Sequence, residues 1–365
     1  MDEMNNHIHS VSILTDDNPY KVLIVDDEEA NRKLESQILS TPEFEVTALD
    51  NAKDALNLLR AQDFDVVLLD KLMPGMSGDE LCYKIRHELN LPLLPVIMVT
   101  ATTASNELEK SMKIGANDFI RKPYSTSEFV ARVKTFANQK RITDQLDSAE
   151  SMLFALARMV EAKDTHTGDH CSRLEHAAMV FGQELNLDAA QLLALKRGGV
   201  LHDIGKLGIP DNILLKNSAL NEDEWGIMRN HTVIGERLCS ELSSMKLTLP
   251  IIRSHHEKWD GTGYPDRLKG EQIPILARVF QIVDIYDALA NIRPYKGVFT
   301  LEKIISIMEE EASKGWRDPH LSKVFLKLLR EHPEKLNKPK INDNDSGIEI
   351  FNDITATSIL KSEWR

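Results

Sequence analysis

Five short apolar runs alternate with segments of helical spacing in the first part of the chain, and this alternation constrains the fold more than any other feature. The runs are Lys21–Val25, Phe44–Ala48, Asp65–Leu69, Pro95–Val99 and Asp118–Ile120. Between them, apolar residues recur three or four positions apart, as at Leu34 and Ile38. Continuous apolar strands that alternate with helices are typical of a parallel sheet buried on both faces. We therefore predict a doubly wound α/β domain with a five-stranded parallel sheet over residues 20–136.

The pattern changes after residue 136. Residues 137–163 contain neither Gly nor Pro and lead from a charged stretch into an amphipathic one, which predicts a linking helix. Beyond it nearly all residues follow a helical period, broken at Gly- and Pro-rich loops, so we predict an all-α second domain over 151–334. Segments 1–19 and 335–365 are polar, and we expect an N-terminal extension and a loose C-terminal tail.

The length and charge of the chain limit its function. With 365 residues it is long enough for two domains of ordinary size. Its formal net charge of −13 disfavours binding to DNA, RNA or anionic membranes, and we find no basic recognition helix. No apolar run approaches the ~20 residues of a membrane span, and the N-terminal segment lacks the apolar core of a signal peptide. Three scattered cysteines argue against a disulfide framework, so we expect a cytoplasmic protein.

Polar side chains follow four of the five predicted strands. Asp26 and Asp27 follow the first strand, Asp70 the third, Thr100 the fourth and Lys122 the fifth. The carboxyl ends of parallel strands meet at one crevice, so these groups should lie together. Three carboxylates that converge would repel one another, and they suit a hard cation such as Mg²⁺. Asp70 could then attack a phosphoryl group whose oxygens Lys122 and Thr100 hold.

This set of positions resembles the receiver domain of two-component response regulators. The resemblance rests on Val25-Asp26-Asp27, the run from Asp70 to Gly78, Thr100-Ala101 and Lys122-Pro123. It implies that Asp70 accepts a phosphoryl group from a histidine kinase. It implies further that Asp27 and Asp70 bind Mg²⁺. Asp26 and the carbonyl group of Leu72 would assist them, and Phe119 would be the switch aromatic.

Histidines are concentrated in the helical part of the chain. Seven of the twelve are His166, His170, His176, His202, His231, His255 and His256. The adjacent pair His202-Asp203 could face two metals, with the carboxylate as a bridge. Asp284 lies in an apolar helical run, where a metal would relieve the cost of an unpaired carboxylate. His and Asp ligands together suit Fe, Mn, Zn, Ni or Cu better than Ca²⁺.

These residues resemble the HD-GYP family of metal-dependent phosphohydrolases. The resemblance rests on the run His255–Pro265, which includes Gly263-Tyr264-Pro265, and on the upstream run Leu201–Asp211. It implies an all-helical domain with a bi- or trinuclear metal centre, with Fe or Mn as the expected ions. It also implies a phosphodiesterase that converts cyclic di-GMP to pGpG and sometimes to GMP.

The resemblance also assigns roles by position. The first metal would be held by His170, His202, Asp203 and Asp284, and the second by Asp203, His231, His255 and His256. Asp203 would thus bridge two metals, which at ~4 Å apart can share a hydroxide that attacks phosphorus. Lys206 would steady the phosphate or the leaving oxygen, which makes it catalytic together with Asp203. Arg293 and Lys296 would clamp the phosphates.

One departure from the family pattern concerns a third metal. Members with three metals carry a glutamate four residues before the first histidine ligand, and here that position is His166. Residues four apart share a helical face, so His166 could still reach a metal. Its neutral side chain would compensate less charge, so we favour two metals and keep three as the alternative.

The order of the two halves predicts regulation. A phosphoacceptor domain that is joined by an unbroken helix to a hydrolase suggests that phosphorylation controls hydrolysis through this helix, within one chain or in a homodimer; a passive spacer is the alternative. The substrate could instead be another cyclic dinucleotide such as 3′,3′-cGAMP. The remaining alternative is a signalling protein that binds cyclic dinucleotides without hydrolysing them.

Overall fold

The computed structural model describes residues 18–101, 104–165, 170–216, 218–291 and 299–337. The chain divides into two compact units, Met1–Gln145 and Leu146–Arg365, and the division falls inside one long helix. We describe each unit by itself. The predicted domain bounds, 20–136 and 151–334, stay predictions beside this division.

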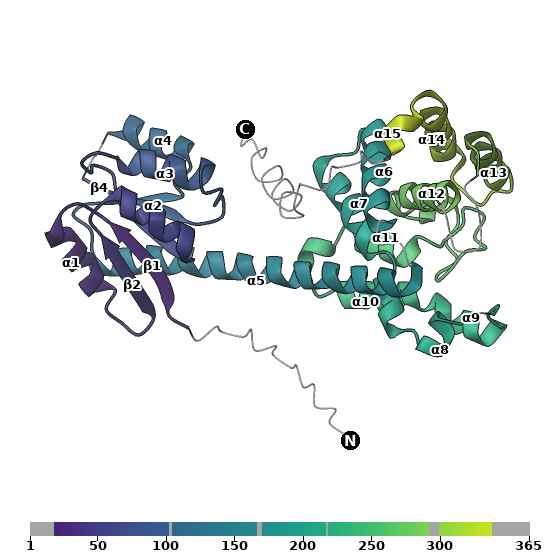
Figure 1. Ribbon diagram of the computed structural model, residues 1–365, viewed down its shortest axis with the longest axis horizontal. Coiled ribbons are helices and arrows are strands. Elements are labelled where there is room, and N and C mark those ends of the chain that lie inside the picture. The colour runs from purple at the N-terminus through teal and green to yellow at the C-terminus, as the bar shows by residue number, and fades with distance from the viewer. Residues whose placement is uncertain (1–17, 102–103, 166–169, 217, 292–298, 338–365) are drawn as a thin grey trace, which may run out of the picture. The chain divides into compact units, whose positions relative to one another are not determined.

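The first unit contains the predicted five-stranded parallel sheet (Figure 1). Its strands are β1 (Tyr20–Val25), β2 (Phe44–Leu49), β3 (Val66–Asp70), β4 (Val96–Thr100) and β5 (Asp118–Arg121). They follow the order β2-β1-β3-β4-β5, and every neighbouring pair is parallel. The doubly wound fold predicted for this part of the chain is therefore confirmed.

Helices cover both faces of this sheet. They are α1 (Glu29–Ile38), α2 (Ala52–Ala61), α3 (Gly78–His87), α4 (Ser105–Ile114) and the first part of α5 (Thr126–Thr165). On one face α2 and α3 bury Leu56 and Leu81, and on the other α5 buries Phe129. Because both faces are buried, the strands are continuously apolar, which is why the sequence indicates them so clearly.

Helix α5 is a single element of 40 residues. It contains the predicted linking helix but already begins at Thr126, so the last helix of the first unit and the linker are continuous. Its first part packs Phe129 and Val133 against the sheet, and its last part buries Ala157 and Val160 in the second unit. None of the helices in the described part of the chain is long and apolar enough to cross a membrane.

The described part of the second unit contains helices and no strand, as predicted. The α-helices after α5 are α6 (His170–Glu184), α7 (Ala189–Leu201), α8 (Asp211–Leu214), α9 (Glu222–Arg229), α10 (His231–Cys239), α11 (Leu249–Ser254), α12 (Ile275–Ala290), α13 (Leu301–Ser313), α14 (Pro319–Glu331) and α15 (Pro333–Leu336). Three 3₁₀ segments are η1 (Ile204–Gly208), η2 (Ser243–Met245) and η3 (Gly270–Gln272). Helix α12 lies in the core, where Phe280 is fully buried with Phe181 of α6 and Phe325 of α14.

Candidate active site

Seven His and Asp side chains meet in the second unit in two groups. One group holds Asp203, His231, His255 and His256, and the other holds His170, His202 and Asp284. Within each group, one possible ligand atom of every residue lies within 4.8 Å of those of the others. The structure thus brings together all the predicted metal ligands that it describes. His166, Arg293 and Lys296 lie outside the described residues.

The residues of the two groups come from helices that are distant in the sequence, and six of the seven lie at helix ends. His170 begins α6, His202 and Asp203 follow α7, His231 begins α10, His255 and His256 follow α11, and Asp284 lies within α12. The apolar core holds these helices in place, with Leu174 of α6 and Ile251 of α11 packed into the same buried cluster as α12. A buried hydrogen bond of 3.0 Å from Gln281 Nε2 to the carbonyl oxygen of Ser254 ties α12 to the end of α11.

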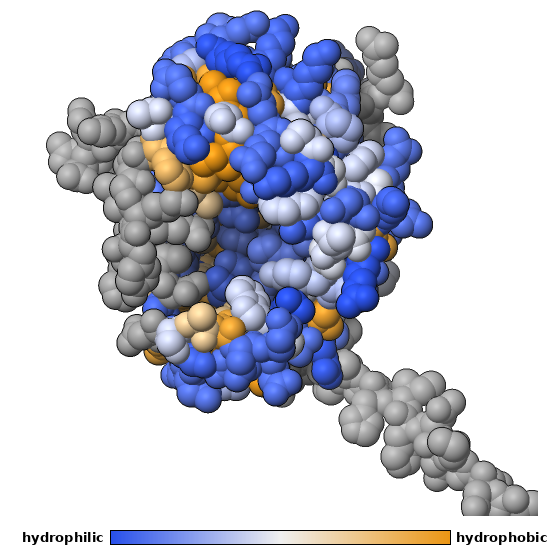
Figure 2. Space-filling model, turned by 90° about the vertical axis from the view of Figure 1, so that its right-hand side faces the viewer, coloured by the Kyte–Doolittle hydropathy of each residue, from blue (hydrophilic) through white to orange (hydrophobic). Residues whose placement is uncertain are grey.

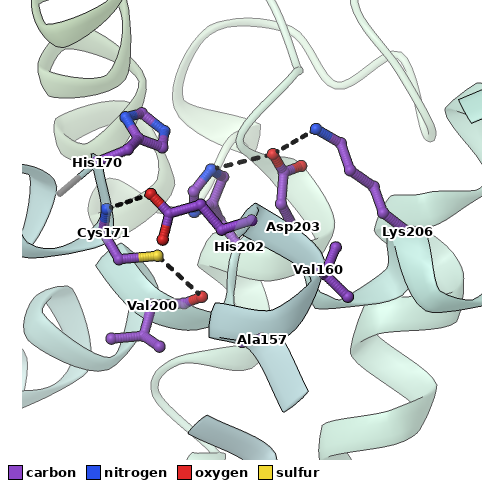
Figure 3. A pocket seen from close by; sticks show the side chains of 9 residues that line it. Ala157, Val160, His170, Cys171, Val200, His202, Asp203 and Lys206 are labelled. Carbon is purple, nitrogen blue, oxygen red and sulfur yellow. Dashed lines mark hydrogen bonds and ion pairs between the residues drawn. The ribbon is translucent and has the colours of Figure 1, made fainter. Parts of the chain in front are cut away.

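Asp203 lies between the two groups. Its Oδ2 is 3.3 Å from His202 Nε2, and its Oδ1 is 3.3 Å from His231 Nε2 and 3.9 Å from His255 Nε2. Lys206 Nζ is 2.8 Å from Oδ2 (Figure 3). Burial opposes ionisation of Asp203, but the ammonium of Lys206 and the imidazole of His202 outweigh it, so the pKa of this carboxyl lies well below its usual value. One carboxylate therefore faces both groups with one oxygen each.

The histidines of the larger group are held in the neutral form that binds metals. Burial lowers the pKa of His231, lowers that of His255 further and lowers that of His256 to about 3. Since a carbonyl oxygen can only accept, the Nδ1 of His231 donates to Met228 O (2.7 Å) and the Nδ1 of His255 to Ile252 O (2.9 Å). Each Nε2 therefore keeps its lone pair.

Three buried acceptors at the centre have no hydrogen-bond partner among the described residues. They are Asp203 Oδ1, His231 Nε2 and His255 Nε2, and they face one another. A buried acceptor without a partner is costly. A divalent cation would satisfy all three at once, so the residues present fit a metal ion. No thiolate belongs to either group, which leaves His and carboxylate ligands typical of Fe, Mn or Zn.

Asp287 is a site residue that the sequence reasoning missed. His170 Nδ1 donates to its Oδ2 (2.6 Å), while Arg173 Nε and Asn291 Nδ2 both donate to its Oδ1 (2.8 Å each). A carboxylate that holds the second nitrogen of a ligand histidine fixes its tautomer and ring orientation. Because Asp287 binds the Nδ1 of His170, the Nε2 of His170 can act as the metal ligand in the smaller group.

Asp287, and not Asp284, is the buried carboxylate in the apolar run of α12. Asp287 is 4% exposed, whereas Asp284 is only partly buried, contrary to our reasoning from the sequence. The sequence signal for Asp287 was its spacing of three residues from Asp284, because residues three apart lie near one helical face.

Lys206 reaches Asp203 because the chain leaves the α-helical path after Leu201. Helix α7 ends there, and η1 follows as a 3₁₀ segment in which Lys206 N donates to Asp203 O (3.0 Å). Gly205 permits η1 to touch α10: a Cβ at this position would lie 1.8 Å from the carbonyl oxygen of His231. Only glycine allows this approach, and it brings Asp203 to His231.

The loop that contains Gly263-Tyr264-Pro265 is fastened by Glu257, another residue that the sequence did not reveal. Glu257 is fully buried, and its carboxylate accepts hydrogen bonds from the backbone nitrogens of Asp266 (2.6 Å) and Leu268 (3.0 Å). The ring of Tyr264 consequently lies against the larger ligand group, with its centroid 4.8 Å from that of His256.

A recess lies beside the smaller ligand group (Figure 3). It is lined by Ala157, Val160, Glu161, His170, Cys171, Val200, His202, Asp203 and Lys206. Figure 2 shows that one face of the molecule is hollowed and that mainly hydrophilic residues line the hollow.

The strand-end residues of the first unit also meet. Lys122 Nζ is 2.7 Å from both Asp26 Oδ2 and Asp70 Oδ1, and the backbone nitrogen of Leu72 donates to Asp70 Oδ2 (2.7 Å). Thr100 is buried, and its carbonyl oxygen accepts from Lys122 N (2.8 Å). Burial raises the pKa of Asp70, and Lys122 opposes this rise. The acid pocket predicted from the strand ends is thus formed around one ammonium group.

The two remaining predicted residues of this pocket are also placed. Asp27 follows the buried Asp26 and is partly buried, and Phe119 of β5 is partly buried beneath the guanidinium of Arg121, whose carbon lies 5.4 Å from the ring centroid.

The first unit is a sheet domain of the phosphoacceptor type, and the second is a helical domain with two His and Asp ligand groups. Together they define a response regulator with an enzymatic output. Family models agree: a response regulator receiver domain matches residues 22–134, and an HD domain matches residues 155–321. The chain belongs to the family of response regulators that carry an HD domain.

Three relatives extend this comparison. The chain is 31% identical to the cyclic di-GMP phosphodiesterase of Thermotoga maritima, over 88% of this chain and 94% of the relative. It is also 31% identical to the cyclic di-GMP phosphodiesterase response regulator RpfG of Xanthomonas campestris pv. campestris, over 84% and 87%. A 3′3′-cGAMP-specific phosphodiesterase of Vibrio cholerae is 37% identical, but over only 54% of this chain and 37% of the relative.

Proposed function

We propose that this protein is a metal-dependent phosphodiesterase that hydrolyses cyclic di-GMP to pGpG under the control of phosphorylation. The observation that carries the proposal is the placement of Asp203, which faces both ligand groups with one oxygen each. The two relatives that match along most of their length are cyclic di-GMP phosphodiesterases, which supports the choice of substrate.

Each group would hold one divalent ion, with Fe or Mn expected. His170, His202 and Asp284 would hold the first ion, and His231, His255 and His256 the second, with Asp203 shared between them. When bound, the metal pair supplies the nucleophilic water and neutralises charge on the phosphodiester. His166 would be a ligand only if a third metal binds.

Residues outside the ligand set would act on the substrate. Lys206 already lies beside Asp203, where its ammonium group would bind a phosphate oxygen or stabilise the leaving 3′-oxygen. Arg293 and Lys296 remain proposed as a phosphate clamp on the strength of their positions in the family motif.

The experiment that tests this function measures hydrolysis by anaerobically purified protein reconstituted with Fe²⁺ or Mn²⁺. We expect cyclic di-GMP to yield pGpG, resolved by liquid chromatography, and chelation of the metal to abolish the product. Parallel reactions with 3′,3′-cGAMP test the second candidate substrate, which the 37% identity to a cGAMP-specific relative favours. Binding of cyclic di-GMP without turnover in either metal form would contradict the enzymatic proposal and favour a binding protein.

Control by phosphorylation rests on the pocket of the first unit. We propose that a histidine kinase phosphorylates Asp70, with Mg²⁺ held by Asp26, Asp27, Asp70 and the Leu72 carbonyl, and that Thr100 and Lys122 bind the phosphoryl oxygens. Phe119 would respond as the switch aromatic. Helix α5 is the covalent path to the second unit, and a homodimer stays a prediction.

Phosphorylation of Asp70 is expected to change the rate of hydrolysis roughly fivefold or more, the usual lower size of a coupling between two sites. Asp70→Asn should make the rate independent of a small-molecule phosphodonor such as acetyl phosphate, because the amide cannot accept the phosphoryl group. Kinetics of wild type and variant, with and without the donor, check this.

Asp63→Asn, which removes an exposed carboxylate from the same unit, should still respond. Equal rates for wild type with and without the donor, at measured full phosphorylation, would show that the first unit does not control the second.

A further inference from the structure

Two aromatic rings enclose an arginine next to the larger ligand group. Trp225 and Arg229 lie one turn apart on α9, and the guanidinium carbon of Arg229 is 5.9 Å from the centroid of the Trp225 ring. The same carbon is 5.8 Å from the centroid of the Tyr264 ring. Both distances are typical of cation–π contacts. We call these three residues the Trp–Arg–Tyr cluster.

The cluster extends from the ligand groups to solvent. The Tyr264 ring lies 4.8 Å from the His256 ring and 6.4 Å from the His231 ring, centroid to centroid. At its other end, Trp225 is 40% exposed. Arg229 is the last residue of α9 and His231 the first of α10, so the short connection between the helices fixes the cluster relative to a predicted metal ligand. Figure 2 shows the hollow above the part of the molecule that contains α8 and α9.

The N–H groups of the Arg229 guanidinium are available as hydrogen-bond donors. Its guanidinium forms no ion pair or hydrogen bond with any residue in the described ranges, although Glu222, Asp223 and Glu224 occupy the first turn of its own helix. Glu224 instead pairs with Lys216 (2.5 Å). The two rings orient the planar guanidinium of Arg229 without using its N–H groups, and these can still donate to a ligand.

We infer that Trp225 and Arg229 form a guanine-binding subsite for the cyclic dinucleotide, an inference that rests on the proposed function. The arginine fork matches the O6 and N7 acceptors of guanine, whereas adenine places an amino donor beside N7. The indole ring of Trp225, a residue that is 40% exposed, would stack on the same base. Tyr264 forms the wall between this subsite and the ligand groups. A phosphodiester at the metals would therefore leave one base within reach of the cluster.

The test combines a substitution in the protein with a change in the ligand, and it compares the separate effects with the joint effect. We measure kcat/KM of the metal-loaded full chain for cyclic di-GMP and for its 7-deazaguanine analogue, which lacks N7 but keeps both phosphates. Arg229→Met should lower kcat/KM for cyclic di-GMP about tenfold or more through KM, as expected for loss of a bidentate base contact. The deaza substitution should likewise lower kcat/KM of the wild type. It should change kcat/KM of Arg229→Met little further, because the partner of N7 is already gone.

Further variants separate the contributions. Trp225→Leu should lower kcat/KM about tenfold, and Trp225→Phe should restore most of it, since stacking needs only an aromatic ring. Arg237→Met on α10, which removes an exposed positive charge without touching the cluster, is the matched control and should behave as wild type. Hydrolysis of bis(p-nitrophenyl) phosphate, which offers no guanine edge to Arg229, should fall less in Arg229→Met than hydrolysis of cyclic di-GMP does, and it should be unchanged in Arg237→Met.

Each contrary result has a distinct meaning. Additive losses for Arg229→Met and the deaza ligand would show that Arg229 does not contact N7 and would overturn the guanine assignment. Wild-type kinetics of Arg229→Met and Trp225→Leu would overturn the subsite itself, as would an equal loss on bis(p-nitrophenyl) phosphate. Hydrolysis of bis(p-nitrophenyl) phosphate with neither binding nor cleavage of cyclic di-GMP would instead overturn the proposed substrate, and the inference with it.

Discussion

Asp203→Asn is expected to remove at least one metal ion per chain and to slow hydrolysis of cyclic di-GMP by roughly a thousandfold, equivalent to about 4 kcal/mol of transition-state stabilisation. The amide has the size of the carboxylate but neither its charge nor its second equivalent oxygen. The His231, His255 and His256 group would then consist of neutral ligands alone. Metal content by mass spectrometry and the rate of pGpG formation check this prediction.

The control for this variant is Glu241→Gln, which removes one negative charge from an exposed position of the same unit. It should keep the metal content and the rate of the wild type. Circular dichroism of Asp203→Asn separates loss of metal from loss of fold. If a folded Asp203→Asn kept two ions per chain and a rate within a few fold of wild type, the bridging role of Asp203 would be wrong.

Gly205→Ala is expected to destabilise the second unit by about 3 kcal/mol or more, because overpacking against a rigid backbone has no easy relief. The new Cβ would lie 1.8 Å from His231 O and 2.5 Å from Gly235 N, so η1 and α10 must move apart. That movement also separates Asp203 from His231, and metal affinity should fall with stability. Urea unfolding of the metal-free protein, followed by tryptophan fluorescence, measures the effect, since all four tryptophans lie after residue 145.

Gly226→Ala is the matched control. A Cβ on Gly226 meets nothing within 4 Å, and the residue lies inside α9, where alanine is the better helix former. This variant should stabilise the unit by roughly 0.5–1 kcal/mol. A urea midpoint for Gly205→Ala equal to that of the wild type would show that the close approach of η1 to α10 is not needed.

The sheet of the first unit could be predicted from sequence because its strands are buried on both faces. Each strand is then a continuous apolar run, and the polar residue that follows it marks the carboxyl edge, as Asp70 and Lys122 do. The start of α5 was predicted less well. No Gly or Pro marks the end of the first unit, because the helix is unbroken between Thr126 and Thr165.

The convergence of seven His and Asp side chains could be predicted from motifs, whereas the residues that support them could not. Asp287 and Arg229 take their importance from contacts with residues far away in the chain, His170 and Tyr264, and Glu257 takes its importance from the backbone nitrogens of a nearby loop. Helical periodicity places Asp284 and Asp287 near the same face, but it does not tell which one is buried. The roles assigned to the metal ligands, Lys206, Arg293 and Lys296 stay predictions until they are measured.

The origin of the seven ligand residues from five different helices or their ends has a consequence for the lifetime of the protein. Ions held by α6, α10, α11 and α12 at once act as a cross-link over more than a hundred residues of chain. An unfolded chain cannot offer this geometry, so each ion adds stability that grows with the logarithm of its free concentration. Metal supply would thus set not only how fast the enzyme works but also how often its second unit opens to proteases.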